Sequence, residues 1–151
     1  MIHGSCLCGA IRFEIAKAAG PFELCHCSRC RKVTGSAFFS GLYVHIEDFR
    51  LVAGKDLIAT YEAPILREPP AYRASFCSRC GSPVPNPGPE RPRRSGLLEI
   101  PAGLLDDDPG MKPDKHIFIE VKSPWFKITD DLPQLDLQGL IALRANTKMP
   151  E

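Results

Sequence analysis

Three cysteines lie within six residues of one another in the stretch "LCHCSRC", at Cys25, Cys27 and Cys30. A Cys-x-Cys-x-x-Cys run can place three sulfurs on one side of a junction between a strand and a turn. A catalytic zinc commonly has three protein ligands and an exchangeable fourth position, whereas a structural zinc is closed by four. We therefore expect this cluster to hold a catalytic Zn²⁺ whose fourth position receives the substrate.

The other four cysteines form two close pairs, Cys6 with Cys8 and Cys77 with Cys80. Two residues apart in an extended segment, Cys6 and Cys8 should point to the same side. The "CSRCG" turn directs both of its sulfurs inward, so the two pairs together supply the four ligands of a structural Zn²⁺. The alternative is that Cys6 and Cys8 are merely small buried residues. Seven clustered cysteines in a reducing compartment indicate metal ligands rather than disulfides.

A zinc ion bound by three thiolates is a weak Lewis acid, because its charge is more than offset. It suits a bound external thiolate, which the metal keeps deprotonated near neutral pH. This chemistry predicts a thiol substrate that captures an electrophile.

Four charged or polar residues beside the three cysteines have two interpretations each. His26 lies between two ligands and should face the opposite side, as a pocket residue or as a histidine satisfied by backbone hydrogen bonds. Arg29, Arg31 and Lys32 either form a solvated face or receive the carboxylates of an anionic thiol such as glutathione.

The elements that carry these residues are mostly predicted strands, because apolar and polar residues alternate along them. The "SRCRKVTG" segment should form one or two helical turns closed by Gly35. The proline-rich "SPVPNPGPERP" segment should be a loop. We expect a mainly β fold, a small antiparallel domain with short helical turns and metal-binding turns. The predicted strands cover residues 8–15, 22–25, 36–46, 48–54, 57–63 and 71–77, and order resumes over 95–110 and 115–128.

The composition predicts one globular domain in a chain of 151 residues, of which 44% are hydrophobic and 25% charged. A net charge of +1 provides no broad field for nucleic acid or a membrane surface. No apolar run is long enough to cross a bilayer, and the N-terminus does not resemble a signal peptide. We expect a cytoplasmic protein.

Four stretches occur in the order seen in the family of glutathione-dependent formaldehyde-activating enzymes and centromere protein V. The resemblance covers residues 2–133, and 134–151 form a C-terminal tail that is a short helix or disordered. The proline-rich segment after Cys80 departs from the family pattern and leaves the substrate open. The stretches are "GSCLCGAIRFE", "CHCSRCRKVTGSAF", "FCSRCGSPV" and "GLLDDDPGMKPDKHIFIEVKSPWFKITDDLP".

This resemblance implies a zinc-binding β-tent fold with two metal positions and a carbon–sulfur lyase activity. The substrates would be glutathione and formaldehyde, joined as S-(hydroxymethyl)glutathione on an open three-cysteine zinc. By the family motif, Cys6, Cys8, Cys77 and Cys80 would hold structural zinc, and Cys25, Cys27 and Cys30 catalytic zinc. Two alternatives remain: a zinc-stabilised binding module without activity, and a redox sensor or zinc reservoir. The oligomeric state and the general acid are not predicted.

Among other residues, Trp125 is expected in the core and His116 is expected to be a strand-end histidine bonded to backbone. The run from Asp106 to Asp108 should be a turn, and the arginine-rich segment at 90–94 a solvated loop rather than an anion site. His3 and His45 carry no recognisable signal.

Overall fold

The structure is a computed structural model and describes residues 1–62, 73–85 and 96–146. Its α-helices are α1 (Ser28–Thr34) and α2 (Leu137–Asn146). The strands are β1 (Ile2–Ser5), β2 (Arg12–Ile15), β3 (Phe22–Cys25), β4 (Phe39–His45), β5 (Phe49–Ala53), β6 (Ile58–Glu62), β7 (Arg73–Cys77), β8 (Leu97–Pro101), β9 (Lys115–Ile117) and β10 (Gln134–Leu135). Short 3-10 turns are η1 (Ile46–Asp48), η2 (Lys55–Leu57), η3 (Ala102–Leu104) and η4 (Ile119–Val121).

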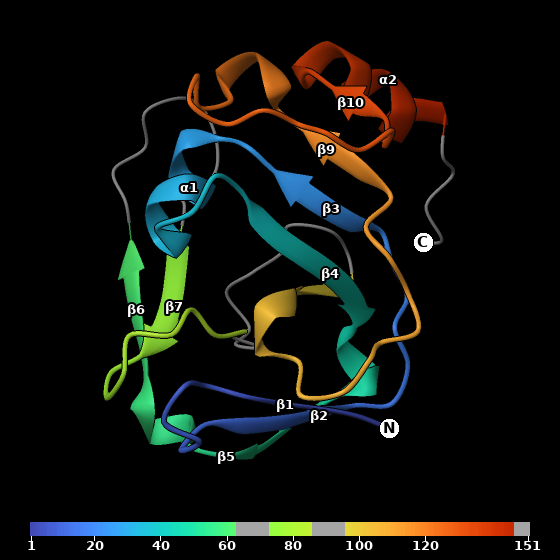
Figure 1. Cartoon of the computed structure of the whole chain (residues 1–151). Coiled ribbons are helices and arrows are strands. Elements are labelled where there is room, and N and C mark those ends of the chain that lie inside the picture. The colour runs from blue at the N-terminus through green and yellow to red at the C-terminus, as the bar shows by residue number, and fades with distance from the viewer. Residues whose placement is uncertain (63–72, 86–95, 147–151) are drawn as a thin grey trace.

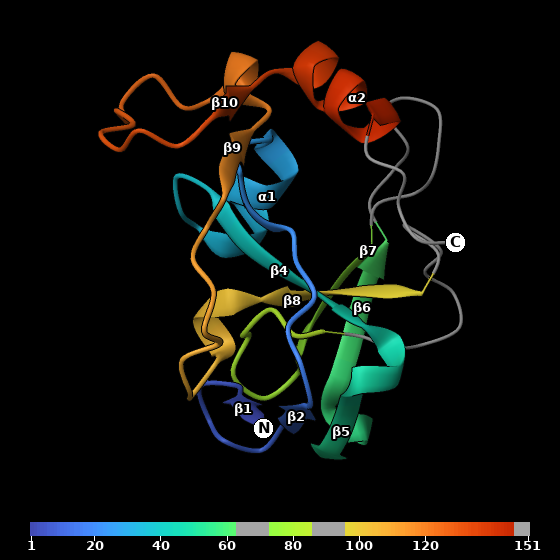
Figure 2. The same cartoon turned by 90° about the vertical axis from the view of Figure 1, so that its right-hand side faces the viewer.

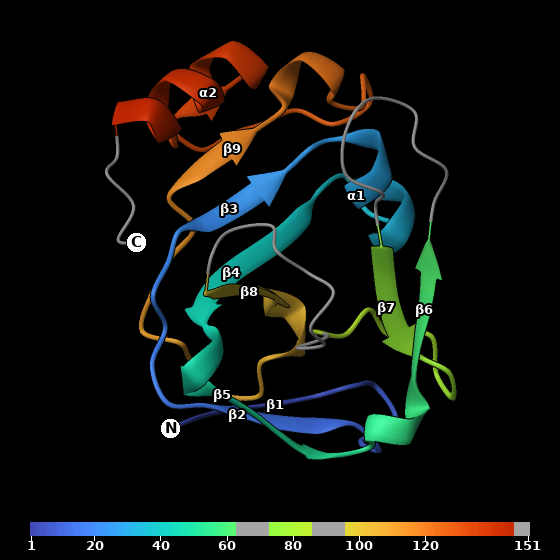
Figure 3. The same cartoon turned by 180° about the vertical axis from the view of Figure 1, so that it is seen from behind.

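The strands form three small sheets, ordered β1-β2-β5, β10-β9-β3-β4-β8 and β6-β7. The first sheet lies at one end of the molecule and α2 at the other, with the β6–β7 hairpin along one side (Figures 1 and 3). Figure 2 shows the same separation of α2 from β1 and β2 after a quarter turn. The predicted mainly β fold is therefore confirmed.

Most neighbouring strands are antiparallel, as expected, but β9 runs parallel to both β3 and β10. In this register Leu24 is opposite His116 and Cys25 is opposite Ile117. Parallel neighbours need a long connection, and here the chain returns beside β3 after about ninety residues. The sequence pattern carried no signal for this pairing.

The main core fills the space between the three-stranded and five-stranded sheets. Its buried side chains come from alternate positions of the facing strands, as half-buried strands require. Two smaller apolar clusters surround the cysteines, one around Ile11 and Cys77 and one around Ile117 and Leu140. The main core comprises Ile2, Phe13, Ile15, Val44, Leu98 and Ile100.

Several predicted elements have different bounds in the structure. The strand expected over 8–15 begins at Arg12, and the strand expected over 36–46 covers Phe39–His45. Within the ordered segment expected over 115–128, the alternation of Ile117, Ile119 and Val121 does not continue as a strand. β9 ends at Ile117, because Phe118 adopts a left-handed backbone with φ 59° and precedes η4. After β7, Pro83 forms an isolated bridge to Phe76, so the proline-rich segment begins along the sheet. The rest of the predicted loop, the arginine-rich segment at 90–94 and Tyr72 lie outside the described residues.

No helix in the described ranges is both long and apolar enough to span a membrane. The division of the chain at residue 133 stays a prediction. What the structure adds is that residues beyond it form β10, an edge strand of the five-stranded sheet, and α2.

Candidate metal centres

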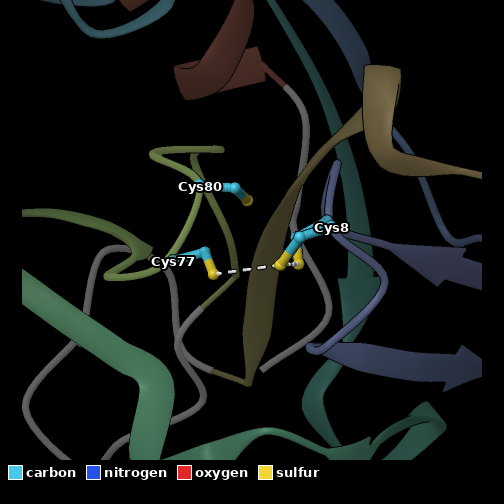
Figure 4. Close-up of side chains that lie close together, drawn as sticks. Cys8, Cys77 and Cys80 are labelled. Atoms are coloured by element: carbon cyan, nitrogen blue, oxygen red, sulfur yellow. Dashed lines mark hydrogen bonds between the residues drawn. The ribbon is translucent and has the colours of Figure 1, made fainter.

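The first cysteine cluster is built from two turns that are about seventy residues apart. The turn between β1 and β2 carries Cys6 and Cys8, and the turn that begins at the end of β7 carries Cys77 and Cys80. All four Sγ atoms lie within 4.8 Å of one another. Figure 4 shows Cys8 and Cys77 pointing toward each other, with Cys80 nearby. The cluster connects the three-stranded sheet to the β6–β7 hairpin.

Both turns depend on glycine. β1 ends at Ser5, so Cys6 and Cys8 converge through a turn and not through the extended backbone that we expected. The Gly9 N–H donates to the Cys6 carbonyl at 2.8 Å, and Gly9 has φ 70°. The Gly81 N–H donates to the Cys77 carbonyl, also at 2.8 Å, and φ is 79°. Glycine adopts these left-handed angles without the steric cost of a side chain.

The donors of this cluster fit a tetrahedral zinc ion. Zn–S bonds of about 2.3 Å place the sulfurs of a tetrahedron about 3.8 Å apart. Two Sγ pairs in the cluster lie 3.5 and 3.9 Å apart. The Ile11 N–H donates to Cys6 Sγ at 3.3 Å, and hydrogen bonds from Ser82 lower the pKa of Cys80 to about 6. Both effects favour the thiolate that a metal binds.

The second cluster lies where β3 meets α1. Cys25 is the last residue of β3, Cys27 is the N-cap of α1, and Cys30 lies inside the helix. Their Sγ atoms are within 4.8 Å of one another, and the Cys30 N–H donates to Cys27 Sγ at 3.4 Å. The helix ends at Gly35, which has φ 63°, so the predicted short helix closed by glycine is confirmed. We call Cys25, Cys27 and Cys30 the three-cysteine cluster.

Crowding controls the ionisation of these three thiols. Hydrogen bonds from Cys25 and Cys30 lower the pKa of Cys27 to about 2. The same contacts, together with burial, raise the pKa of Cys30, and the Cys27 contact raises that of Cys25. One negative charge thus suppresses the next, as expected for closely spaced acids. A divalent cation would relieve this repulsion and favour all three thiolates, so the donor set fits a zinc ion.

The surroundings of the three-cysteine cluster are apolar. Cys25 packs with the buried side chains of Phe39, Ile117 and Leu140, and Phe118 and Leu135 flank this group. The left-handed backbone of Phe118 costs of order 1 kcal/mol or more. It turns the chain immediately after β9, so that a partly buried ring packs beside the sulfurs instead of continuing the strand.

No fourth histidine, cysteine or carboxylate joins the three cysteines within this cluster, as far as the described ranges extend. His26, the obvious sequence neighbour, is not one of its members. The two cysteine clusters thus differ in the number of donors they bring together, four against three.

His26 belongs to a separate buried group. Its Nε2 lies 2.8 Å from Nδ1 of His116, and His116 Nε2 lies 3.1 Å from both carboxylate oxygens of Asp130. Both rings are buried, and the Phe38 and Phe126 rings pack against His26. His26 is therefore a buried residue outside the sulfur cluster, and it is not satisfied by backbone hydrogen bonds.

His116 was expected to bond to backbone, and that expectation is wrong, because its ring nitrogens face His26 and Asp130. Sequence analysis did not identify Asp130. The residue follows an irregular segment, and no periodic pattern pointed to it. Its carboxylate accepts from the Leu132 N–H at 3.0 Å, and this bond and His116 lower its pKa.

Arg31 is neither a solvated charge nor a free receptor for substrate carboxylates. Its guanidinium donates to the carbonyls of His26 and Val121 and to the Ser123 hydroxyl, the last at 2.6 Å. The side chain thereby connects α1 to the segment after η4. Lys32 is exposed and Arg29 is partly buried.

Trp125 is not in the core, as we had expected, but is 71% exposed. Trp125 lies in a turn and contacts the Phe126 ring edge-on. The run from Asp106 to Asp108, predicted to be a turn, bends at Asp106 and Asp107, and Asp107 pairs with His3 at 2.6 Å.

Comparison with known proteins gives consistent results. The family model described as glutathione-dependent formaldehyde-activating enzyme matches residues 1–121. A Halomonas elongata protein named "Putative glutathione-dependent formaldehyde-activating enzyme" is 32% identical over 130 residues, 85% of this chain and 81% of that protein. The fold is also similar to the crystal structure of a Rhodobacter sphaeroides protein, with a TM-score of 0.52 and 22% identity. That match covers 74% of this chain and 91% of the Rhodobacter chain. This last likeness concerns the fold alone.

Proposed function

Because this chain belongs to the family of glutathione-dependent formaldehyde-activating enzymes, we propose that it joins a small thiol to formaldehyde. Glutathione is the thiol that the family name indicates, and S-(hydroxymethyl)glutathione would be the product. The reaction belongs to the carbon–sulfur lyase class. The thiol sulfur forms a bond to the carbonyl carbon, the π electrons move to oxygen, and that oxygen takes a proton from water while the thiol proton goes to solvent.

The observation that carries this proposal is the three-cysteine cluster without a fourth protein donor in the described ranges. We assign Cys25, Cys27 and Cys30 to a catalytic Zn²⁺. A zinc ion held there supplies the means to keep a substrate thiol deprotonated near neutral pH.

We assign Cys6, Cys8, Cys77 and Cys80, the four-cysteine cluster, to a structural Zn²⁺. Its closed donor set leaves no position for a substrate. Two zinc ions per chain follow from this assignment.

The protein residues around the three-cysteine cluster have a second task. Phe39, Ile117 and Phe118 form an apolar surface beside the sulfurs. Such a surface keeps bulk water from the thiolates and strengthens the electrostatic interactions among them. The chemistry requires reduced thiols, so we place the protein in a reducing compartment such as the cytoplasm.

The test compares wild type with Cys27→Ser in a mixture of formaldehyde and glutathione. Exchange NMR follows S-(hydroxymethyl)glutathione formation, and the spontaneous rate is subtracted. We expect wild type and Ser28→Ala, a control at the adjacent exposed position, to accelerate the reaction, and Cys27→Ser to lose the acceleration. Wild type that carries both metals and gives no acceleration would contradict the proposal and favour a binding module.

A further inference from the structure

The wall of the three-cysteine cluster is completed by a part of the chain that the family model does not reach. The family match ends at residue 121, whereas Leu135 lies in β10 and Leu140 in α2. Leu140 is 1% exposed and packs in the same apolar cluster as Cys25, and Leu135 lies against this cluster. Figure 1 shows α2 and β10 beside β9, the strand that pairs with β3.

Polar contacts hold helix α2 at both ends, and the one near its end reaches β3, the strand that carries Cys25. At its start, the Asp136 carboxylate caps the helix by accepting from the Gly139 N–H at 2.7 Å. The Leu137 N–H donates to the Glu120 carboxylate at 3.2 Å. Near its end, Arg144 lies 3.5 Å from Glu23, which is on β3 two residues before Cys25. The helix therefore has a defined position over the site.

Only one side chain of α2 is buried, and that side chain is Leu140. The other large apolar residues of the helix, Leu137, Ile141 and Leu143, are between 40% and 53% exposed. Leu140 is thus the one side chain that α2 contributes to the apolar cluster around Cys25, with Leu135 as its neighbour from β10.

We propose that Leu140 determines the size of the aldehyde that reacts at the three-cysteine cluster. This inference rests on the proposed function. When a sulfur atom bonds to a carbonyl carbon, the aldehyde's substituent must fit beside the sulfurs. In formaldehyde that substituent is hydrogen, and in acetaldehyde it is a methyl group. We expect a leucine in the apolar cluster around Cys25 to limit this space, so that hydrogen fits better than methyl. One methyl group can change a rate by about tenfold or more.

The first experiment measures the ratio of acetaldehyde to formaldehyde addition, with glutathione as the thiol. Leu140→Ala should raise this ratio about tenfold relative to wild type. Ile141→Ala is the matched control, because it shortens a similar side chain that is 53% exposed on the same helix, and it should leave the ratio unchanged. Equal ratios for Leu140→Ala and wild type would overturn the proposal.

The second experiment does not depend on either aldehyde. Iodoacetamide labels the folded protein, and mass spectrometry follows the alkylation of each cysteine. Leu140→Ala should accelerate labelling of Cys25, Cys27 and Cys30 several-fold and leave Cys77, which is fully buried in the other cluster, at the wild-type rate. Unchanged labelling rates of the three cysteines would contradict the proposal that Leu140 shields them. Faster labelling of all cysteines would indicate lost folding, and Leu140→Val then replaces Leu140→Ala in both experiments.

The two proposals fail separately. If wild type does not accelerate the formaldehyde reaction, the proposed function fails, and the labelling rates still decide whether Leu140 shields the cluster. If wild type is active and the aldehyde ratio does not respond to Leu140→Ala, only the present inference fails.

Discussion

The imidazole rings of His26 and His116 are joined directly, with Nε2 of the first 2.8 Å from Nδ1 of the second. His116 is held in turn by the Asp130 carboxylate. When Asp130 is ionised and both imidazoles are neutral, His116 donates from Nε2 and its Nδ1 accepts from His26 Nε2–H. The remaining nitrogen, His26 Nδ1, is buried and has no hydrogen-bond partner among the described residues. These hydrogen bonds connect the end of β3 to β9, immediately beside Cys25 and Cys27.

Breaking the hydrogen bonds between His26, His116 and Asp130 should destabilise the fold. His116→Ala removes two hydrogen bonds and leaves His26 Nε2 unsatisfied in the interior, which should cost about 3 kcal/mol in free energy of unfolding. His45→Ala, at a half-buried position on β4, should cost less than about 1 kcal/mol. Urea denaturation at neutral pH measures both values. Similar losses of unfolding free energy in the two variants would show that the hydrogen bonds of His116 contribute no specific stability.

Stability should also decrease as the pH falls below about 6.5. Burial, with repulsion from His116 and Lys122, lowers the pKa of His26 from 6.5 to about 4, and the nearby Ala37 backbone opposes this only in part. Between about pH 4 and pH 6.5 His26 binds a proton in the unfolded chain but not in the folded chain, so acid favours unfolding. The slope from this residue is at most about 1.4 kcal/mol per pH unit.

Denaturation of wild type and His26→Gln at pH 7.5, 6.5 and 5.5 checks this prediction. The difference between the two proteins removes the proton uptake by cysteines that both share. We expect wild type to lose more stability than the variant over this range. Parallel curves would mean that His26 does not keep its neutral form on folding.

The two cysteine clusters should respond differently to the loss of one ligand. Cys77→Ser opens the four-cysteine cluster, which joins β7 to the turn between β1 and β2, and should cost several kcal/mol or roughly 10 °C in Tm. Cys27→Ser opens the three-cysteine cluster, whose members lie close together in sequence, and should lower Tm less. Metal analysis and thermal denaturation of the two variants measure this. Equal losses of Tm would contradict the assignment of only one cluster as structural.

Gly54 should be the least replaceable of the left-handed glycines. It has φ 82°, and a Cβ atom there would lie 2.5 Å from the Ala10 carbonyl and 2.8 Å from Ile11. Gly54→Ala must therefore move the backbone beside the four-cysteine cluster and should cost more than about 3 kcal/mol. Gly110 has φ 69° but open space around it, so Gly110→Ala should show only the backbone cost of about 1–2 kcal/mol. Urea denaturation distinguishes them, and equal costs would argue against the close approach.

Local features of the fold were predictable from the sequence because they depend on neighbouring residues. Gly35 ends α1 through its own backbone freedom, and the alternation of apolar residues from Ile11 to Ile15 identified β2 as a half-buried strand. The end of β9 was not predictable, because Ile117, Ile119 and Val121 preserve the alternation through a left-handed residue at 118. Trp125 was placed in the core because a lone tryptophan beside Phe126 is usually buried, and the structure instead leaves it 71% exposed.

The sequence by itself predicted the pairs Cys6 with Cys8 and Cys77 with Cys80 and the group of Cys25, Cys27 and Cys30, since the cysteines within each are two or three residues apart. The tertiary structure brings the two pairs together across 69 residues. Tertiary structure decided what surrounds them. The pairing of His26 with His116 crosses ninety residues. Leu140 joins the apolar cluster of Cys25 because β9 and β10 extend the sheet beyond β3. Such contacts depend on which strands lie side by side, and strand pairing over these distances depends on the packing of the whole core, which leaves no local pattern in the chain.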